Sequence, residues 1–231
     1  FGFYRCSKAF GLLVHRGYNS TLAIFKTVFE FIKMSKLADS GQQFFRIACY
    51  FEASLAIVAI VFGWLFSIDP IAELYFTESA VWQGLLATLP LLVLFFAIQA
   101  MPYKALIDIR RLLQESLGEH LRDRHWSDLL VLAAIAGFSE ELLFRGLIQQ
   151  GLEQAWGIQA GLWVSSLIFA LAHAVTPLYA IMAFLMSLYL GVSMDFGAER
   201  NLLTPMVIHG FYDFVAFVVI VKQSFSDKGL Q

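Results

Sequence analysis

Six runs of apolar residues constrain the fold of this chain more than any other feature. They cover about residues 47–66, 81–101, 129–150, 161–175, 178–194 and 202–221. A membrane-spanning helix needs about 20 predominantly apolar residues. Hydrophobic residues make up 59% of the 231-residue chain and charged residues 15%, whereas soluble domains average about 45–50% and about 25%. The sequence therefore predicts an all-α, polytopic membrane bundle of about six transmembrane helices.

Lysine and arginine are concentrated on one side of these predicted helices. They occur before residue 47, between residues 102 and 128, and in the tail, whereas the loops on the other side carry Arg200 and several acidic residues. Because positively charged loops stay in the cytoplasm, we predict that both termini are cytoplasmic. We expect an N-terminal cytoplasmic or interfacial segment over residues 1–46, one transmembrane domain over residues 47–222 with its functional core in residues 129–221, and a tail over residues 223–231.

The N-terminal stretch allows two interpretations. Met34, followed by Ser35 and Lys36, resembles a natural start. Residues 1–33 are accordingly either an extension ahead of that start or a genuine interfacial helix.

Residues 103–126 combine many charges with a regularly spaced apolar set. The apolar residues fall on one helical face, and they are Leu106, Ile109, Leu113, Leu117 and Leu121. We predict that this amphipathic helix lies flat on the inner leaflet. The net charge of -2 leaves no basic face for a phosphate backbone, so nucleic acid is not an expected partner. Cys6 and Cys49 are too few for a disulfide framework or a cysteine metal cluster.

Three ionisable residues interrupt the third apolar run. Glu140, Glu141 and Arg145 lie within six residues, and each costs roughly 2.5 to 3.5 kcal/mol at bilayer depth. Residues four apart share a helical face, so Glu141 and Arg145 are expected to pair. Glu140 then points elsewhere, and a buried carboxylate without a partner either holds a proton or is matched from another helix. Such a group is suited to act as a general base or acid.

Two histidines in other runs are candidate partners. His173 follows Phe169 by four residues, and His209 precedes Asp213 by four, so each pair shares a helical face. The His209–Asp213 pair is open to three interpretations: an acid that orients an imidazole, a two-ligand metal site, or donors directed at an oxyanion.

Each of these groups also has a purely structural interpretation. Glu141 with Arg145 forms a clamp in that interpretation, and a single intramembrane histidine is an interhelical hydrogen-bond partner. Glu52, early in the first run, is expected to extend to the inner interface or to pair locally. Apart from Glu52, these polar residues all occur in the last four runs: two glutamates, an arginine, two histidines and an aspartate. Their joint occurrence favours one shared internal cavity.

The motifs Glu140-Glu141-x-x-x-Arg145, Phe169-x-x-x-His173 and His209-x-x-x-Asp213, in this order on separate apolar runs, resemble the CPBP family of CAAX prenyl proteases and bacteriocin-processing enzymes. The resemblance covers roughly residues 129–221 and implies an intramembrane endopeptidase. It implies that Glu140 and His173 activate a water and that His209 and Asp213 stabilise the oxyanion or help to bind a metal. Glu141 and Arg145 would hold the site together. The last motif commonly ends in Asn, so Asp213 is a departure from the family pattern.

Metal dependence stays open at the level of sequence. Glu140, His173 and His209 are a possible three-ligand set for a divalent metal such as zinc, yet the chain has no HExxH motif. A metal-free glutamate mechanism fits the residues equally well.

The expected partners are the lipid bilayer and a membrane-anchored protein or peptide substrate, in the inner membrane if the source is bacterial. Two other functions compete with hydrolysis. One is a non-catalytic immunity or scaffold protein of the same fold, and the other, ranked last, is a proton-coupled transporter.

Overall fold

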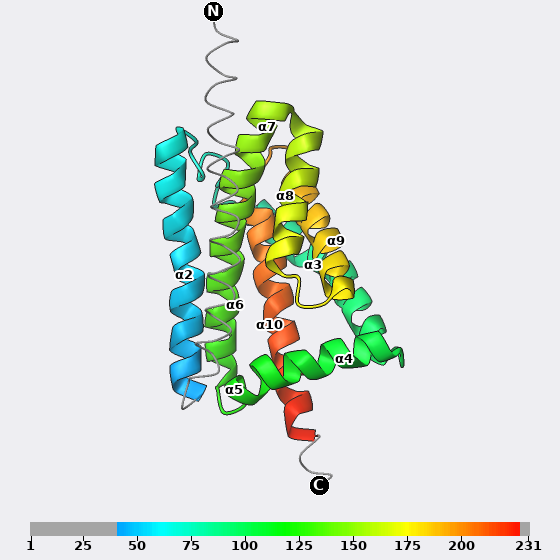
Figure 1. The fold of residues 1–231 in the computed structure, drawn as a ribbon. Coiled ribbons are helices and arrows are strands. Elements are labelled where there is room, and N and C mark those ends of the chain that lie inside the picture. The colour runs from blue at the N-terminus through cyan, green and yellow to red at the C-terminus, as the bar shows by residue number, and fades with distance from the viewer. Residues whose placement is uncertain (1–40, 227–231) are drawn as a thin grey trace, which may run out of the picture. The chain divides into compact units, whose positions relative to one another are not determined.

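The computed structural model describes residues 41–226, and within that range every regular element is helical (Figure 1). The all-α prediction is therefore confirmed for this part of the chain. The predictions for residues 1–33, and for the tail from residue 227 onward, concern residues outside the described range.

Each predicted apolar run corresponds to a helix or to a continuous series of helices. The bounds are α2 (Gly41–Phe66), α3 (Glu78–Ala100), the uninterrupted series α6 (Trp126–Glu141), η2 (Leu142–Gln149) and α7 (Gln150–Trp156), then α8 (Ile158–Ala172), α9 (Pro177–Ser193) and α10 (Leu203–Ser226). Three helices are long and apolar enough to cross a membrane: α2, α3 and the Leu203–Ser224 part of α10. Helices α8 and α9 are apolar but shorter, with 15 and 17 residues. The count of six spans thus stays a prediction.

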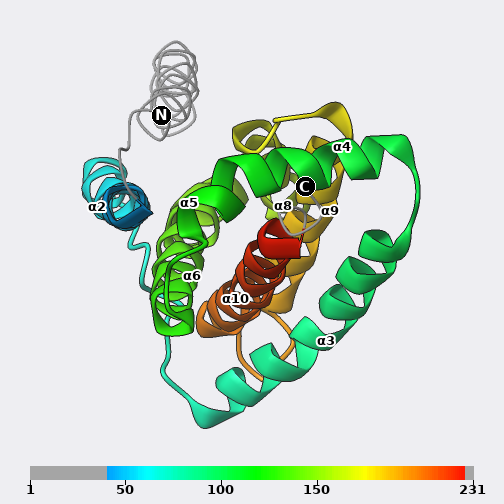
Figure 2. The same cartoon turned by 90° about the horizontal axis from the view of Figure 1, so that it is seen from below.

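Helix α10 occupies the centre of the described bundle. It packs against α6, α3 and α9, and α6 in turn packs against α2 (Figures 1 and 2). Glycine permits the closest of these approaches: a Cβ on Gly137 of α6 would lie 2.5 Å from the backbone nitrogen of Gly210 on α10. Small residues at such contacts let two helical backbones come together. The contact brings the end of α6 beside His209.

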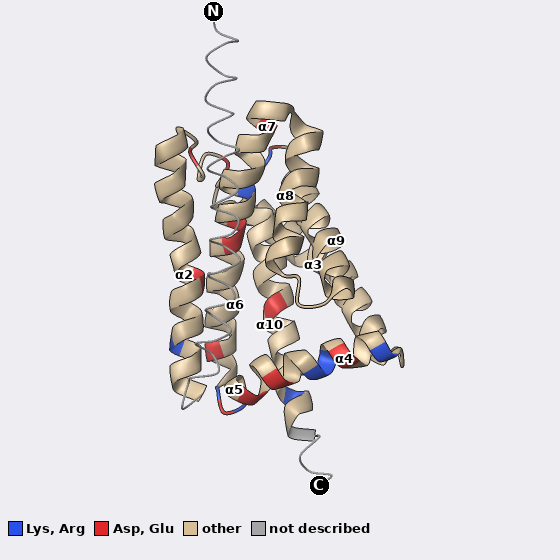
Figure 3. Ribbon diagram, in the orientation of Figure 1, with Lys and Arg blue, Asp and Glu red and all other residues tan. Residues whose placement is uncertain are grey.

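A crosswise segment closes one end of the bundle. It comprises α4 (Lys104–Leu113), the π-helical η1 (Gln114–Gly118) and α5 (Glu119–Leu121), and it passes the start of α2 and the end of α10 (Figures 1 and 3). Leu106, Ile109 and Leu121 are buried, while Asp108 and Arg111 are exposed. Of the predicted apolar face, these three leucine and isoleucine residues are buried and Leu113 and Leu117 are half-buried, while the position of the segment on the inner leaflet stays a prediction. The start of α2, the crosswise segment and the end of α10 share one end of the bundle, as cytoplasmic termini would require.

At the opposite end, Asn201 fixes the start of α10 to the loop after α2. Its Nδ2 donates to the carbonyl of Tyr75 at 2.9 Å, and its Oδ1 accepts from the backbone N–H of Tyr75 at 3.3 Å and of Leu203 at 2.9 Å. Nearby, Arg200 donates to Glu153 of α7 at 2.8 Å. These bonds set the position of α10 along the bundle.

Candidate active site

The end of α6 carries two buried carboxylates. Glu140 is 7% exposed and Glu141 is fully buried. Directly after them the chain passes into the wider π-helical turns of η2, in which Arg145 is also buried. Irregular π-helical segments occur frequently at functional sites. The two glutamates thus lie at the junction between a regular helix and an irregular one.

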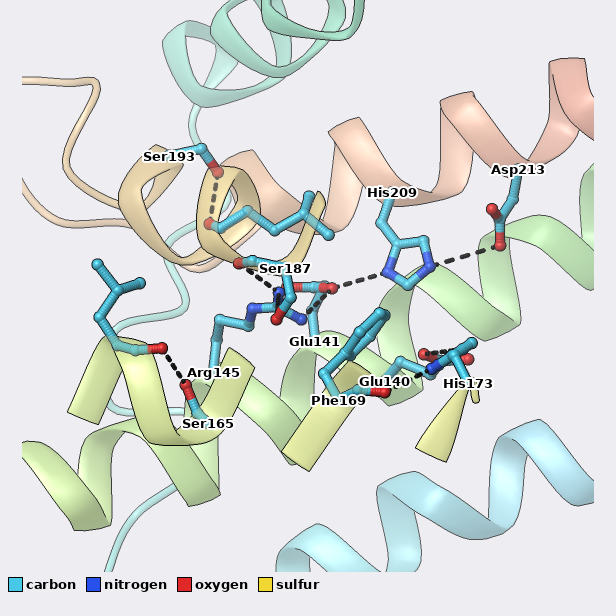
Figure 4. Close-up of polar contacts among 12 residues, drawn as sticks. Glu140, Glu141, Arg145, Ser165, Phe169, His173, Ser187, Ser193, His209 and Asp213 are labelled. Atoms are coloured by element: carbon cyan, nitrogen blue, oxygen red, sulfur yellow. Dashed lines mark hydrogen bonds and ion pairs between the residues drawn. The ribbon is translucent and has the colours of Figure 1, made fainter. Parts of the chain in front are cut away.

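Glu141 and Arg145 form the predicted pair. Arg145 Nη1 donates to Glu141 Oε1 at 2.9 Å, and Nη2 donates to the carbonyl oxygen and the hydroxyl of Ser187 on α9 at 2.8 and 2.9 Å. The guanidinium carbon lies 5.0 Å from the ring centroid of Phe169 on α8, a cation–π distance. Arg145 therefore joins the three helical elements that surround it (Figure 4).

Glu141 has a second partner that spacing along the chain does not predict. His209 Nδ1 lies 2.7 Å from Glu141 Oε1, so the imidazole of α10 is hydrogen-bonded to the carboxylate of α6. His209 Nε2 faces Asp213 Oδ2 at 3.5 Å (Figure 4). That distance is at the long limit for a hydrogen bond. The buried His209 ring is consequently fixed through Nδ1, while Nε2 is less firmly engaged.

Glu140 faces His173, which caps the end of α8. His173 Nδ1 lies 2.9 Å from the carbonyl oxygen of Phe169, and its ring stacks on that of Phe169 with centroids 4.3 Å apart. His173 Nε2 is 3.6 Å from Glu140 Oε2, which is too long for a direct hydrogen bond. The His173 side chain is 30% exposed. This pair is the more accessible part of the site.

All six side chains selected from the sequence thus meet in one region. Glu140 with His173 forms one pair, and Glu141 links Arg145 to His209 and, through it, to Asp213. The Phe169 ring lies between the two groups, stacked on His173 and edge-on to His209 at 6.1 Å. The connection after His173 is short: α8 ends at Ala172, and Thr176 caps α9.

Glu52 lies where the sequence interpretation did not place it. It was expected to reach the interface or to pair locally, but its Oε2 is buried without a hydrogen-bond partner in the described part of the chain. It lies within electrostatic range of Glu140, Asp213 and His209. It shares a helical face with the buried Ala48, four residues earlier.

Tyr179 and Ser187 were also missed. Tyr179, in the first turn of α9, lies within electrostatic range of Glu140 and Asp213, and Ser187 binds Arg145. A small polar or aromatic residue in an apolar run carries little signal, since such residues are common in membrane helices.

The three residues named as possible metal ligands are divided between two sets of contacts. Over residues 41–226, no group of three His, Cys, Asp or Glu side chains is close enough together to hold a metal ion. Glu140, His173 and His209 instead belong to the two separate hydrogen-bonding groups described above.

Comparison with known families supports the resemblance drawn from the motifs. Residues 123–215 match a family model described as type II CAAX prenyl endopeptidase Rce1-like. The matched range contains all seven motif residues from Glu140 to Asp213. No curated protein and no solved structure gives a significant match.

Proposed function

Because residues 123–215 match the Rce1-like family model, we propose that this chain is an intramembrane endopeptidase. Its reaction is the hydrolysis of a peptide bond in a membrane-associated protein or peptide by a water that Glu140 and His173 activate. The observation that carries the proposal is the 3.6 Å gap between Glu140 Oε2 and His173 Nε2.

The hydrogen-bonding roles of His173 Nε2 and Glu140 Oε2 explain why one water can bridge them. A carbonyl oxygen can only accept, so His173 Nδ1 carries the hydrogen that it donates to Phe169. In a neutral imidazole Nε2 is then an acceptor, and Glu140 Oε2, buried without a partner in the described region, is an acceptor as well. Two acceptors facing each other require a shared donor. A water molecule has two hydrogens and meets this requirement.

The proposed reaction needs no group beyond these side chains and water. The water oxygen bonds to the scissile carbonyl carbon while its proton passes to Glu140. The tetrahedral intermediate then expels the amine, and Glu140 returns the proton to the leaving nitrogen. The second hydrogen of the water stays on the new carboxyl group, so the products are a carboxylic acid and an amine, which become carboxylate and ammonium when that proton is transferred to the amine. General acid–base catalysis of this kind contributes about 10²–10⁴-fold.

His209 is the proposed oxyanion donor. Glu141 fixes the ring through Nδ1 at 2.7 Å, so when the ring is doubly protonated Nε2–H is directed toward Asp213 and the reacting centre. Asp213 is 3.5 Å away and orients the ring without engaging that hydrogen closely. A preorganised donor of this kind is worth about 10²–10³-fold in turnover.

The transmembrane arrangement is part of the same proposal. Helices α2, α3 and α10 cross the bilayer, and the α6–η2–α7 series with α8 and α9 completes six spans. The crosswise segment α4–α5 lies on the cytoplasmic leaflet, and both termini are cytoplasmic. The positive residues of that segment and their absence from the α7 end, apart from Arg200, support this orientation.

A comparison of membrane proteomes tests the function without a known substrate. Cells that produce the wild-type chain are compared with cells that produce Glu140→Gln, a substitution of equal size, at matched protein abundance. We expect uncut precursors of membrane-associated proteins to accumulate in the Glu140→Gln membranes. The exposed substitution Glu199→Gln serves as the matched control. Identical cleavage patterns in all three membranes would contradict the proposal.

One observation favours a second function, a non-catalytic immunity or scaffold protein of the same fold. Asp213 stands where the resembling family commonly has Asn, and an ionised carboxylate repels an oxyanion. In that case the polar network only stabilises the bundle. Glu140→Gln would then preserve the cellular phenotype, whereas removal of Arg145 would abolish folding.

A further inference from the structure

Glu52 lies on the face of α2 that packs against the site. It follows Ala48 by four residues and precedes Ala59 by seven, and both alanines are buried. At these spacings the three residues share one helical face. The face packs against α6 and η2, the elements that carry Glu140 and Arg145.

Glu52 differs from the other carboxylates of the site in its partners. Glu141 lies within 4.0 Å of Arg145 and His209, Asp213 lies 3.5 Å from His209, and Glu140 lies 3.6 Å from His173. Among the described residues, Glu52 has no basic side chain within 4.0 Å. It is thus the one site carboxylate there without a basic side chain at ion-pair distance, although His209 lies within longer electrostatic range.

Glu52 and Glu140 each have a carboxyl oxygen that lacks a hydrogen-bond partner. The Oε2 atom of each is buried and has no hydrogen-bond partner within residues 41–226. The titratable groups within electrostatic range of Glu52 are Glu140 from α6, His209 and Asp213 from α10, and Cys49 on its own helix. Two of these four are acidic. Facing carboxylates in a medium of low dielectric constant cannot both ionise without a large repulsion, and the usual solution is one shared proton.

We propose that Glu52 is a positioning residue that holds a proton beside Glu140. The two carboxyl groups together carry one negative charge, and the Glu52 hydroxyl donates toward Glu140 either directly or through a water. Donation stabilises the ionised form of Glu140, which is the form that a general base requires. The proton-holding role stands on the burial of the two unpartnered oxygens and on the packing of α2 against α6, and its catalytic consequence rests on the proposed peptidase function.

Infrared spectroscopy of the purified full chain in lipid nanodiscs tests the proton directly. The carbonyl stretch of a protonated carboxyl is separate from the bands of a carboxylate. At neutral pH we expect a protonated-carboxyl band in the wild-type protein that disappears in Glu52→Gln and persists in Glu140→Gln and in the exposed control Glu199→Gln. The proposal is overturned if the wild type lacks the band or if Glu52→Gln retains it unchanged.

Turnover measurements test the catalytic consequence. The probe is a pool of membrane-derived precursor peptides, and the readout is the formation of new carboxyl termini. Gln at position 52 is neutral and keeps a donor, so Glu52→Gln should keep turnover within about tenfold of wild type, whereas Glu140→Gln loses about 10²–10⁴-fold. Glu52→Ala, which lacks the donor, should be slower than Glu52→Gln at equal abundance. A Glu52→Gln loss as large as that of Glu140→Gln would overturn the positioning role.

The two measurements separate this inference from the proposed function. A wild-type protein that shows the Glu52 band but no hydrolysis contradicts the peptidase function and leaves the proton on Glu52 established. Hydrolysis without the band contradicts only the inference.

Discussion

Replacing Arg145 by Met should destabilise the bundle severely, because it strands a buried carboxylate. Arg145 is 1% exposed and makes three hydrogen bonds, one to Glu141 and two to Ser187, at 2.8–2.9 Å. Met fills much of the same space but leaves Glu141, itself fully buried, with only His209 as a partner. Removing one partner of a buried ion pair typically costs about 3–5 kcal/mol. We expect a loss of that size in the free energy of unfolding.

The free energy of unfolding is measured on the purified chain in mixed micelles. The fraction of denaturing detergent is raised stepwise, and the loss of helicity reports unfolding. Arg111→Met is the matched control, since Arg111 lies 3.9 Å from Asp108 with both side chains largely exposed. Exposed pairs contribute about 0–1 kcal/mol. An Arg145→Met effect no larger than that of Arg111→Met would refute the argument from burial.

The double variant Arg145→Met, Glu141→Gln adds a sharper test of the same reasoning. Once the arginine is absent, neutralising Glu141 removes the stranded charge, so the second substitution should cost less than it does in the wild-type protein. Contacting residues show coupling energies of about 0.5–3 kcal/mol. Simple additivity of the two single effects would show that the pair does not act as a unit.

Three further predictions concern the frame and the second half of the site. Gly137→Ala should lower the free energy of unfolding by about 1–3 kcal/mol in the same assay, because the added Cβ would lie 2.5 Å from the backbone nitrogen of Gly210. Gly210→Ala should cost less, because its Cβ would have its nearest contact at 3.3 Å. Equal effects of the two substitutions would contradict the close packing. Asn201→Ala should lower the unfolding free energy by about 1–3 kcal/mol, because the three hydrogen bonds of the buried Asn201 side chain to Tyr75 and Leu203 are lost. An unchanged midpoint would refute this. The Asp213→Asn protein should hydrolyse the precursor pool at least as fast as the wild-type protein, because the substitution removes a negative charge 3.5 Å from His209. A loss of turnover comparable to that of Glu140→Gln would show that the reaction requires the charge of Asp213.

The spacing of residues within one helix predicted part of this site. Four-residue spacing placed Arg145 beside Glu141 and His209 beside Asp213, and both proximities are present. The cost of burying charges in an apolar run also predicted correctly that these residues would gather instead of facing lipid. These inferences succeed because they depend only on helical geometry and on solvation.

Contacts between helices could not be obtained in the same way. The bond from His209 to Glu141 and the bonds from Arg145 to Ser187 depend on how α6, α9 and α10 pack. That packing depends on steric details such as the Gly137 contact. Glu52 was misplaced for a related reason: a glutamate near the end of an apolar run has the same local sequence pattern whether it reaches the interface or turns inward.

The origin of the oxygen in a newly formed carboxyl group tests the central claim most directly. The purified chain in nanodiscs is incubated with the precursor-peptide pool in water enriched in oxygen-18, and new carboxyl termini are analysed by mass spectrometry. The account predicts that the wild-type protein generates termini containing one oxygen-18 atom and that Glu140→Gln and His173→Ala generate almost none. Labelled termini formed at the wild-type rate by Glu140→Gln, or none formed by the wild type with any peptide of the pool, would contradict it.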